Sequence, residues 1–137
     1  MNTEQEILPG LKYVHKSDHR DNTADKSQWT ISEQEERSSF SLMYASKWIV
    51  ENDKGWGLHI IDKTADYLGV GVNRARDLFI AKFVDGAHSN IWHGYPADYV
   101  ANNQDKPDRR VLQEWGTVGY ISFGKVRKVL KGQPCNL

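Results

Sequence analysis

Apolar residues recur every three or four positions in the stretch that follows Ser32, as they do along one face of a helix. Glu35 stands three positions after Ser32, and this spacing is the capping-box pattern that starts many helices. The pattern therefore predicts a helix over residues 33–52. A β-hairpin over residues 46–61 competes with it, because two short apolar runs flank the turn-prone residues 52–55. The sequence leaves both structures open.

A second helical pattern lies between residues 61 and 86, where two amphipathic runs are separated by Gly69 and Gly71. Gly86 follows the second run at the position where a glycine often ends a helix. These positions predict two helices that meet at a sharp turn.

Two shorter helices are predicted nearer the C-terminus. Pro107 is suited to the first turn of a helix that ends at Gly116. Ser122 is suited to the N-cap of a last helix, which Gly132 closes. Together the patterns predict a mainly α protein with helical hairpins, or an α+β protein if residues 46–61 form the β-hairpin.

The first part of the chain shows no such periodicity. Residues 17–28 contain Ala24 as their only apolar side chain and are rich in Asp, Asn, Lys and Ser. A segment of this composition buries too little apolar surface to offset the entropy lost on ordering. We therefore expect residues 1–28 to form a flexible acidic arm and residues 29–137 to form a single globular domain.

Charge and cysteine content narrow the class of protein. The 18 basic and 18 acidic residues cancel, although residues 1–36 are acidic and residues 106–137 are basic, so the basic end is suited to an anionic partner. Cys135 is the only cysteine, which excludes an intrachain disulfide and is typical of a reducing compartment. Residues 1–6 lack the basic start of a secretory signal, and no apolar run is long enough to span a membrane. We therefore expect a cytoplasmic protein without a membrane partner.

The densest group of chemically special side chains lies in residues 92–99, which we expect to form a long ordered loop shaped by Gly94 and Pro96. The candidate ligand-binding residues are Trp92, His93, Tyr95, Asp98 and Tyr99. The three aromatic rings are suited to a wall on which a planar or sugar-like ligand stacks, and His93 and Asp98 are candidate catalytic residues for proton transfer. In the alternative, structural interpretation, the rings cap the core and His93 binds a backbone carbonyl. Under both interpretations we expect Gly94 to adopt a backbone conformation that is costly for other residues.

Residues 61–80 resemble the helix-turn-helix of many bacterial DNA-binding domains, with Ala65 as the small residue of the first helix and Gly69 at the turn. This resemblance implies contacts with DNA. The candidate DNA-binding residues are Asn73, Arg74, Arg76, Lys125, Arg127 and Lys128. Residues 61–85 carry four cations and four carboxylates, so they lack the net positive charge that favours phosphate binding. A helical hairpin in the core is the alternative interpretation.

A wider set of residues resembles a pattern from small uncharacterised bacterial and phage-borne proteins. The set spans residues 82–132 and consists of Lys82-Phe83, Trp92-His93-Gly94-Tyr95-Pro96, Asp98-Tyr99, Lys106-Pro107, Val111-Leu112 and Trp115. The resemblance implies a bacterial or phage origin and no particular activity.

These observations lead to three hypotheses of function. The first is a binding module that recognises an unknown protein or small ligand through residues 92–99. The second is a DNA-binding regulator that uses residues 61–80, and the third is a small hydrolase or transferase that uses His93 and Asp98. We expect no cofactor and no metal ion, because the chain has no H-E-x-x-H pattern, no Walker loop and no dinucleotide-binding fingerprint.

Overall fold

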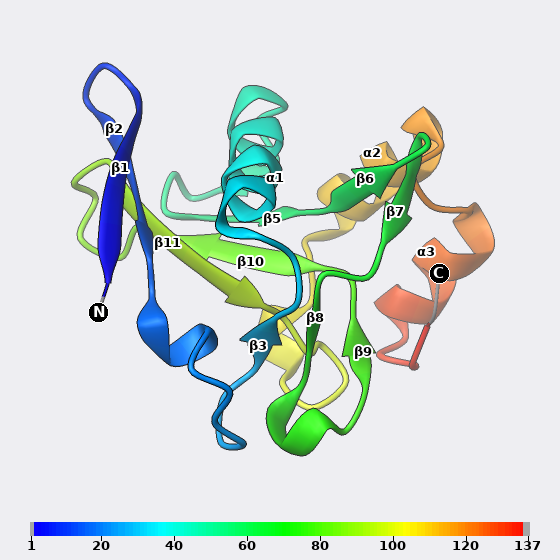
Figure 1. Cartoon of the computed structure of the whole chain (residues 1–137). Helices are drawn as coiled ribbons and strands as arrows, with labels where there is room; N and C mark the ends of the chain where they lie inside the picture. Colours follow the sequence, from blue (N-terminus) through cyan, green and yellow to red (C-terminus); the bar gives the residue numbers. More distant parts are fainter. Residues whose placement is uncertain (1, 136–137) are drawn as a thin grey trace.

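A mixed β-sheet of six strands, rather than a group of helical hairpins, is the largest element of the protein (Figure 1). The computed structural model describes residues 2–135 and has an α+β fold. The prediction of a mainly α protein is therefore wrong. In spatial order the strands of this sheet are β1 (Thr3–Leu8), β2 (Leu11–His15), β11 (Ile91–Pro96), β10 (Ala81–Val84), β5 (Lys54–Gly57) and β4 (Ile49–Val50).

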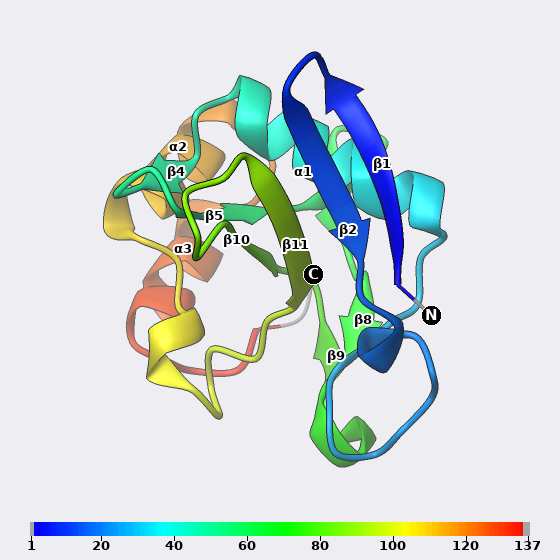
Figure 2. The same ribbon diagram turned by 90° about the vertical axis from the view of Figure 1, so that its left-hand side faces the viewer.

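The N-terminal segment is part of this sheet. β2 runs parallel to β11, with Lys12 opposite Ile91 and Tyr13 opposite Trp92, whereas the other neighbouring strands are antiparallel. Tyr13 is fully buried. Where we expected a flexible arm, residues 3–15 form a β-hairpin whose inner strand lies between β1 and β11 (Figure 2).

Two smaller sheets and three α-helices complete the part of the fold between residues 2 and 135. One small sheet has the strand order β3-β8-β9, and the other is the β6–β7 hairpin. The strands are β3 (Gln28–Trp29), β6 (His59–Ile61), β7 (Thr64–Asp66), β8 (Gly69–Val70) and β9 (Asp77–Leu78). The helices are α1 (Glu33–Ala45), α2 (Arg109–Val118) and α3 (Phe123–Leu130), with short 3-10 helices η1 (Ser17–His19), η2 (Val72–Arg74) and η3 (Asn103–Asp105).

The capping-box prediction is confirmed at the start of α1. The Glu35 backbone N–H donates a hydrogen bond to the Ser32 hydroxyl (3.1 Å), and the Ser32 backbone N–H donates one to the Glu35 carboxylate (2.9 Å). The helix ends at Ala45 instead of continuing to residue 52, because the chain then turns into the β4–β5 hairpin. Of the two structures left open for residues 46–61, the β-hairpin is the one that forms.

The prediction of two helices over residues 61–86 is wrong, because this segment forms strands β7 to β10 and a 3-10 turn. Every side chain from Leu78 to Phe83 is buried. A strand that is covered on both faces shows no alternation of apolar and polar residues. Periodicity alone therefore does not distinguish such a strand from a buried helix.

The two C-terminal helices are confirmed, with small differences at their ends. Val111, Leu112 and Trp115 form the expected apolar face of α2 and are fully buried. The helix continues two residues beyond the expected end and stops at Gly119, whose φ of 94° is suited to a C-cap glycine. As expected, the Ser122 hydroxyl accepts a backbone hydrogen bond at the start of α3.

The core lies on both faces of the six-stranded sheet. Helix α1 covers one face (Figure 1), where the Phe40 ring packs against the rings of Tyr13 and Phe83 at centroid distances of 4.9 and 5.5 Å. On the other face the buried indole N–H of Trp56 donates a hydrogen bond to the Asp105 carbonyl (3.1 Å). The segment that leads into α2 therefore covers the second face near β5.

A buried carboxylate joins the N-terminal hairpin to α1. Glu36 is 0% exposed and accepts hydrogen bonds from the Tyr13 hydroxyl and from the Arg20 guanidinium (2.7 Å). Nδ1 of His15 lies 3.1 Å from the same carboxylate. Removing the partners of a buried charge is strongly destabilising, so residues 13–20 are tied firmly to the helix.

Candidate functional site

Residues 91–96 form strand β11, so the side chains of the expected aromatic loop alternate between the two faces of the sheet. Trp92 faces the core, is 3% exposed, and has its ring 5.8 Å from that of Phe40. His93 and Tyr95 point to the opposite face and are half-buried. The expected wall of three aromatic rings therefore does not form.

Gly94 is required for a reason different from the one we expected. Its φ is not positive, so its backbone is accessible to other residues. It lies opposite Phe83 of β10, and an added Cβ would stand 2.3 Å from Cδ1 of that ring. The position needs glycine because of this close approach.

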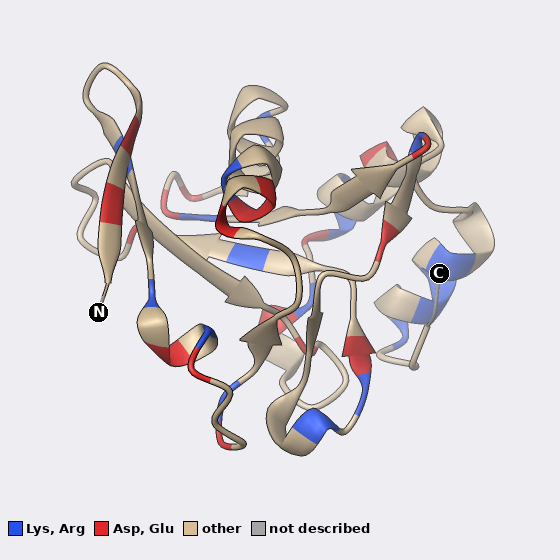
Figure 3. Ribbon diagram, viewed as in Figure 1, with Lys and Arg blue, Asp and Glu red and all other residues tan. Residues whose placement is uncertain are grey.

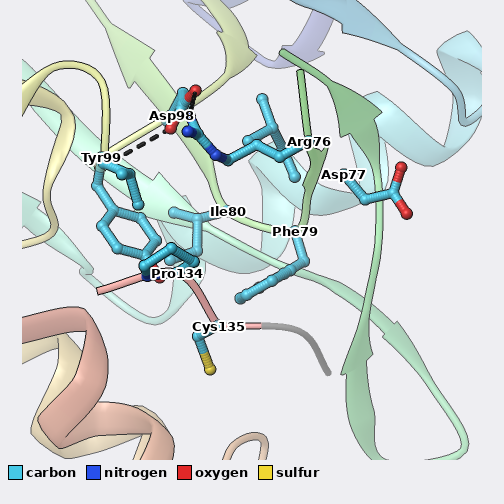
Figure 4. A pocket seen from close by; sticks show the side chains of 11 residues that line it. Arg76, Asp77, Phe79, Ile80, Asp98, Tyr99, Pro134 and Cys135 are labelled. Carbon is cyan, nitrogen blue, oxygen red and sulfur yellow. Dashed lines mark hydrogen bonds and ion pairs between the residues drawn. The ribbon is translucent and has the colours of Figure 1, made fainter. Parts of the chain in front are cut away.

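Asp98 and Tyr99 follow β11 and are held by structural contacts (Figure 4). The Asp98 carboxylate forms an ion pair with Arg76, and the Tyr99 hydroxyl donates a hydrogen bond to the Gln133 carbonyl (2.8 Å). Burial, aided by negative charge nearby, raises the pKa of Tyr99 to about 12. No hydrogen bond or ion pair between residues 2 and 135 joins Asp98 to His93. The two candidate catalytic side chains thus have separate surroundings.

The cavity beside Asp98 and Tyr99 is too small for a ligand. Its volume is about 40 Å³, and it is lined in part by Pro134 and Cys135 from the C-terminal segment (Figure 4). A cavity of this size holds at most one or a few water molecules. We therefore place the candidate site elsewhere.

Tyr95 lines a larger, open groove at the end of β11, which we call the Tyr95 groove. Three segments line it, namely residues 19–27, Val72 and residues 95–105, and its volume is about 160 Å³. The rings of His19 and Tyr95 stack there, with centroids 5.5 Å apart and planes inclined by 18°. The groove therefore combines the N-terminal segment with the stretch that sequence analysis singled out.

A buried ion pair holds the Tyr95 hydroxyl in place. This hydroxyl donates a hydrogen bond to Oδ1 of Asp105 (2.7 Å), and Nζ of Lys82 lies 3.5 Å from the same oxygen. Lys82 and Asp105 are 9% and 5% exposed. Burial, together with the hydrogen bond to the Asp105 carboxylate, raises the pKa of Tyr95 far above its ordinary value. The phenol keeps its proton and stays a donor to Asp105.

The orientation of His19 is set by a backbone carbonyl. Nδ1 of His19 lies 2.8 Å from the carbonyl oxygen of Ser27. Because a carbonyl oxygen only accepts, Nδ1 must carry a hydrogen in this contact, and Nε2 lies 4.0 Å from the Asp18 carboxylate. The Lys26 ammonium, which also lines the groove, pairs with the exposed Asp18 carboxylate at 3.1 Å.

His93 lies on the same sheet face as Tyr95, one pleat further from the groove. Burial, followed by the positive charges of Lys16 and His19, lowers the pKa of His93, and two carboxylates act weakly in the opposite direction. The imidazole is therefore neutral at pH 7, and no contact in the described part of the chain pairs it with an acid.

The candidate DNA-binding residues lie in two places and on no recognition helix. Residues 61–80 contain no α-helix. Asn73 and Arg74 both have positive φ, 56° and 53°, in the turn at η2, and Arg76 is engaged in the ion pair described above. The other three, Lys125, Arg127 and Lys128, lie on α3.

Four residues that line the Tyr95 groove or hold Tyr95 in place were not predicted from the sequence, namely His19, Lys26, Lys82 and Asp105. His19 and Lys26 stand in the polar run that we expected to be flexible, and Asp105 stands between the expected loop and the helix predicted near Pro107, where no element was predicted. Only Lys82 carried a signal. It is the single charged residue in the apolar run 78–83, and a cation in such a place needs a buried anionic partner.

Known proteins offer no template for this arrangement, because no family model, curated protein or solved structure matched the chain. Between residues 2 and 135, no group of three or more His, Cys, Asp or Glu side chains is placed to hold a metal ion. No helix in that range is both long and apolar enough to cross a membrane. We base the functional proposal on the Tyr95 groove.

Proposed function

We propose that the protein is a binding module that recognises a small planar ligand in the Tyr95 groove. The observation that carries this proposal is the stacked pair of His19 and Tyr95, two aromatic residues that both line the groove. Aromatic rings at the edge of a concave site are the usual platform for planar groups. The single cysteine is typical of a reducing compartment, so we place this activity in the cytoplasm.

Both rings are held in position before a ligand arrives. Tyr95 is fixed by its hydrogen bond to Asp105, which in turn pairs with Lys82. His19 is fixed by its hydrogen bond to the Ser27 carbonyl. A site that is ordered in advance loses less conformational entropy on binding and therefore binds more tightly.

The size of the groove and the donors at its rim define the ligand. A volume of about 160 Å³ is small beside typical drug-sized pockets, and it fits a single ring with one substituent. Lys26 and Asn102 place an ammonium and a side-chain amide at the groove. The ion pair of Lys26 with Asp18 is exposed, and such pairs contribute little, so the ammonium is available. Asp98 and Asp105 also line the groove, but each is paired with a cation, Arg76 or Lys82. The ligand we propose is one aromatic or heteroaromatic ring with an acceptor group such as a carboxylate.

Benzoate and benzamidine, which share a ring and differ in charge, test this proposal. In NMR titrations of the full chain, benzoate should shift the amide signals of residues 19–27 and 95–105, and benzamidine should shift them less. Replacing His19 by alanine should weaken benzoate binding by about fivefold, the usual contribution of one ring contact.

The matched control is Tyr67→Phe, which alters an exposed tyrosine outside the groove and should leave the affinity unchanged. Tyr95→Phe keeps the ring but removes the bond to Asp105, and it should weaken binding by loosening the ring. The proposal would be overturned if benzoate shifted amide signals outside the groove, or if His19→Ala left the affinity for benzoate unchanged.

A further inference from the structure

A second groove lies between β7 and the turn that joins α2 to α3. Its volume is about 460 Å³, compared with 160 Å³ for the Tyr95 groove. Phe123, the first residue of α3, lines it and is 51% exposed. We call it the Phe123 groove. Single exposed apolar side chains are common on protein surfaces, so Phe123 indicates a partner surface only together with the cations beside it.

The Phe123 ring is held in place by the helix beneath it. An added Cβ at Gly116 of α2 would stand 2.7 Å from Cε1 of this ring, so the ring rests directly on the glycine. The Ser122 hydroxyl accepts the Lys125 N–H (3.2 Å) and fixes the start of α3, which carries the ring. The exposed part of Phe123 is therefore a preformed apolar surface.

The α3 side of the groove is positively charged, whereas β7 on the other side carries the exposed Asp66. Residues 116–135 contain four cations and no carboxylate, although the whole chain is neutral. Figure 3 shows cationic positions in blue along α3, which carries Lys125, Arg127 and Lys128. Lys125 lines the groove, and Lys128 lies one helical turn further on the same face. A complementary partner would bring carboxylates and an apolar anchor.

The groove is not suited to an added β-strand. The Ala65 backbone N–H of β7 already donates a hydrogen bond to the Tyr120 carbonyl (3.0 Å), so this position of the strand edge is occupied. An occupant must therefore bind mainly through side chains, as an amphipathic helix does when it lies in a groove.

We propose that the Phe123 groove docks an acidic amphipathic peptide segment of a partner protein. The segment inserts an apolar side chain against Phe123 and places carboxylates next to Lys125 and Lys128. A nucleic acid fits less well, because phosphate binding needs the cations but makes no use of the apolar ring.

A fluorescein-labelled helical peptide of about 12 residues, with Leu at every third or fourth position and Glu between, is the probe for this surface. Fluorescence anisotropy with the full chain should detect binding that weakens as salt is added. A peptide with Lys in place of Glu should bind at least about tenfold more weakly, since it reverses the charge complementarity.

Variants of the protein test the apolar contact and the positive charge of the groove separately. Phe123→Ala removes the apolar contact, and Lys125→Glu reverses the charge without touching the core; each should weaken binding of the acidic peptide by about tenfold. Arg109→Glu makes the same charge change at the opposite end of α2 and should have no effect. Circular dichroism confirms that each variant is folded, and if Phe123→Ala does not fold, Lys125→Glu decides alone.

Three results would overturn this proposal. The first is equal binding of the Glu and Lys peptides. The second is an oligonucleotide that binds more tightly than the acidic peptide and is indifferent to Phe123→Ala, which would indicate a nucleic-acid surface. The third is a concentration-dependent dimer in gel filtration that Phe123→Ala abolishes, which would indicate a second copy of this chain as the occupant.

Discussion

At the scale of single residues, a closely packed neighbour can limit which side chain a position accepts more strongly than the backbone conformation at that position does. Gly94 has an ordinary backbone conformation, yet an added Cβ would stand 2.3 Å from Cδ1 of Phe83 and 3.0 Å from the carbonyl oxygen of Lys82. Phe83 is fully buried and has no room to withdraw. The side chain at position 94 is therefore limited by packing between β10 and β11.

We predict that Gly94→Ala destabilises the protein by about 2 kcal/mol, the usual cost of overpacking a rigid core. Urea denaturation gives the free energy of unfolding. Gly86→Ala is the control, because no atom lies within 4 Å of an added Cβ there, and it should change stability by less than about 0.5 kcal/mol. Equal effects of the two substitutions would contradict the packing explanation.

His93 links stability to pH. Burial and the nearby positive charges lower its pKa in the folded protein. As the pH falls below about 6.5, the unfolded chain takes up the proton before the native protein does, so the equilibrium moves towards unfolding. Above that pH the imidazole is neutral in both states and makes no such contribution.

We predict that His93→Gln makes the free energy of unfolding less dependent on pH between about 6.5 and 5. The measurement is a series of urea denaturation curves for the two proteins across this range. The parent protein should lose more stability than the variant as the pH falls. Parallel pH profiles for the two proteins would show that His93 titrates alike in the folded and unfolded states.

At the scale of elements, the β6–β7 hairpin carries an unfavourable turn. Asp62 and Lys63 connect the paired residues Ile61 and Thr64, and both have positive φ, 50° and 72°. Two-residue turns of this kind favour glycine, especially at the second position, because other residues pay a steric cost there. The hairpin therefore forms because its strands pack against the rest of the protein.

We predict that Lys63→Gly stabilises the protein by about 0.5 to 1 kcal/mol, since it relieves this steric cost. Thermal melting or urea denaturation measures the change. Lys131→Gly serves as the comparison, because Lys131 is an exposed lysine with a φ of −84°, and glycine there should destabilise by a similar amount. A loss of stability in Lys63→Gly would contradict the argument from the turn.

At the scale of the whole molecule, the N-terminal segment decides whether the sheet is complete. β1 is an edge strand that is mostly exposed, whereas β2 lies inside the sheet and carries the fully buried Tyr13. Arg20 supplies the guanidinium partner of the buried Glu36. Losing both strands exposes β11 and leaves that carboxylate without its main partners.

We predict that a chain lacking residues 1–10 folds with reduced stability, and that a chain lacking residues 1–20 shows no cooperative unfolding transition. The physical reason is the buried charge of Glu36, whose isolation costs about 3 to 5 kcal/mol, in addition to the lost packing of Tyr13. Near-ultraviolet circular dichroism during urea titration distinguishes the two outcomes. A cooperative unfolding transition in the chain that lacks residues 1–20 would mean that the N-terminal hairpin is dispensable for folding.

The starts of all three helices could be predicted to within about two residues. Ser32 with Glu35, and later Ser122, satisfy backbone N–H groups within one turn of chain, so the information needed lies next to each helix. The buried faces of α2 and α3 were also predictable, because their apolar residues repeat with the period of a helix.

The sheet and the Tyr95 groove were decided by tertiary structure. Strands of two to four residues, such as β8 and β10, are too short to show a period, and one partner strand of each, β3 for β8 and β5 for β10, lies far away in the chain. The polar segment 17–28, which contains His19, has Ala24 as its only apolar side chain. It is ordered by Tyr95, Glu36 and the strand pairing of β2, so its place in the protein depends on contacts that no local pattern encodes.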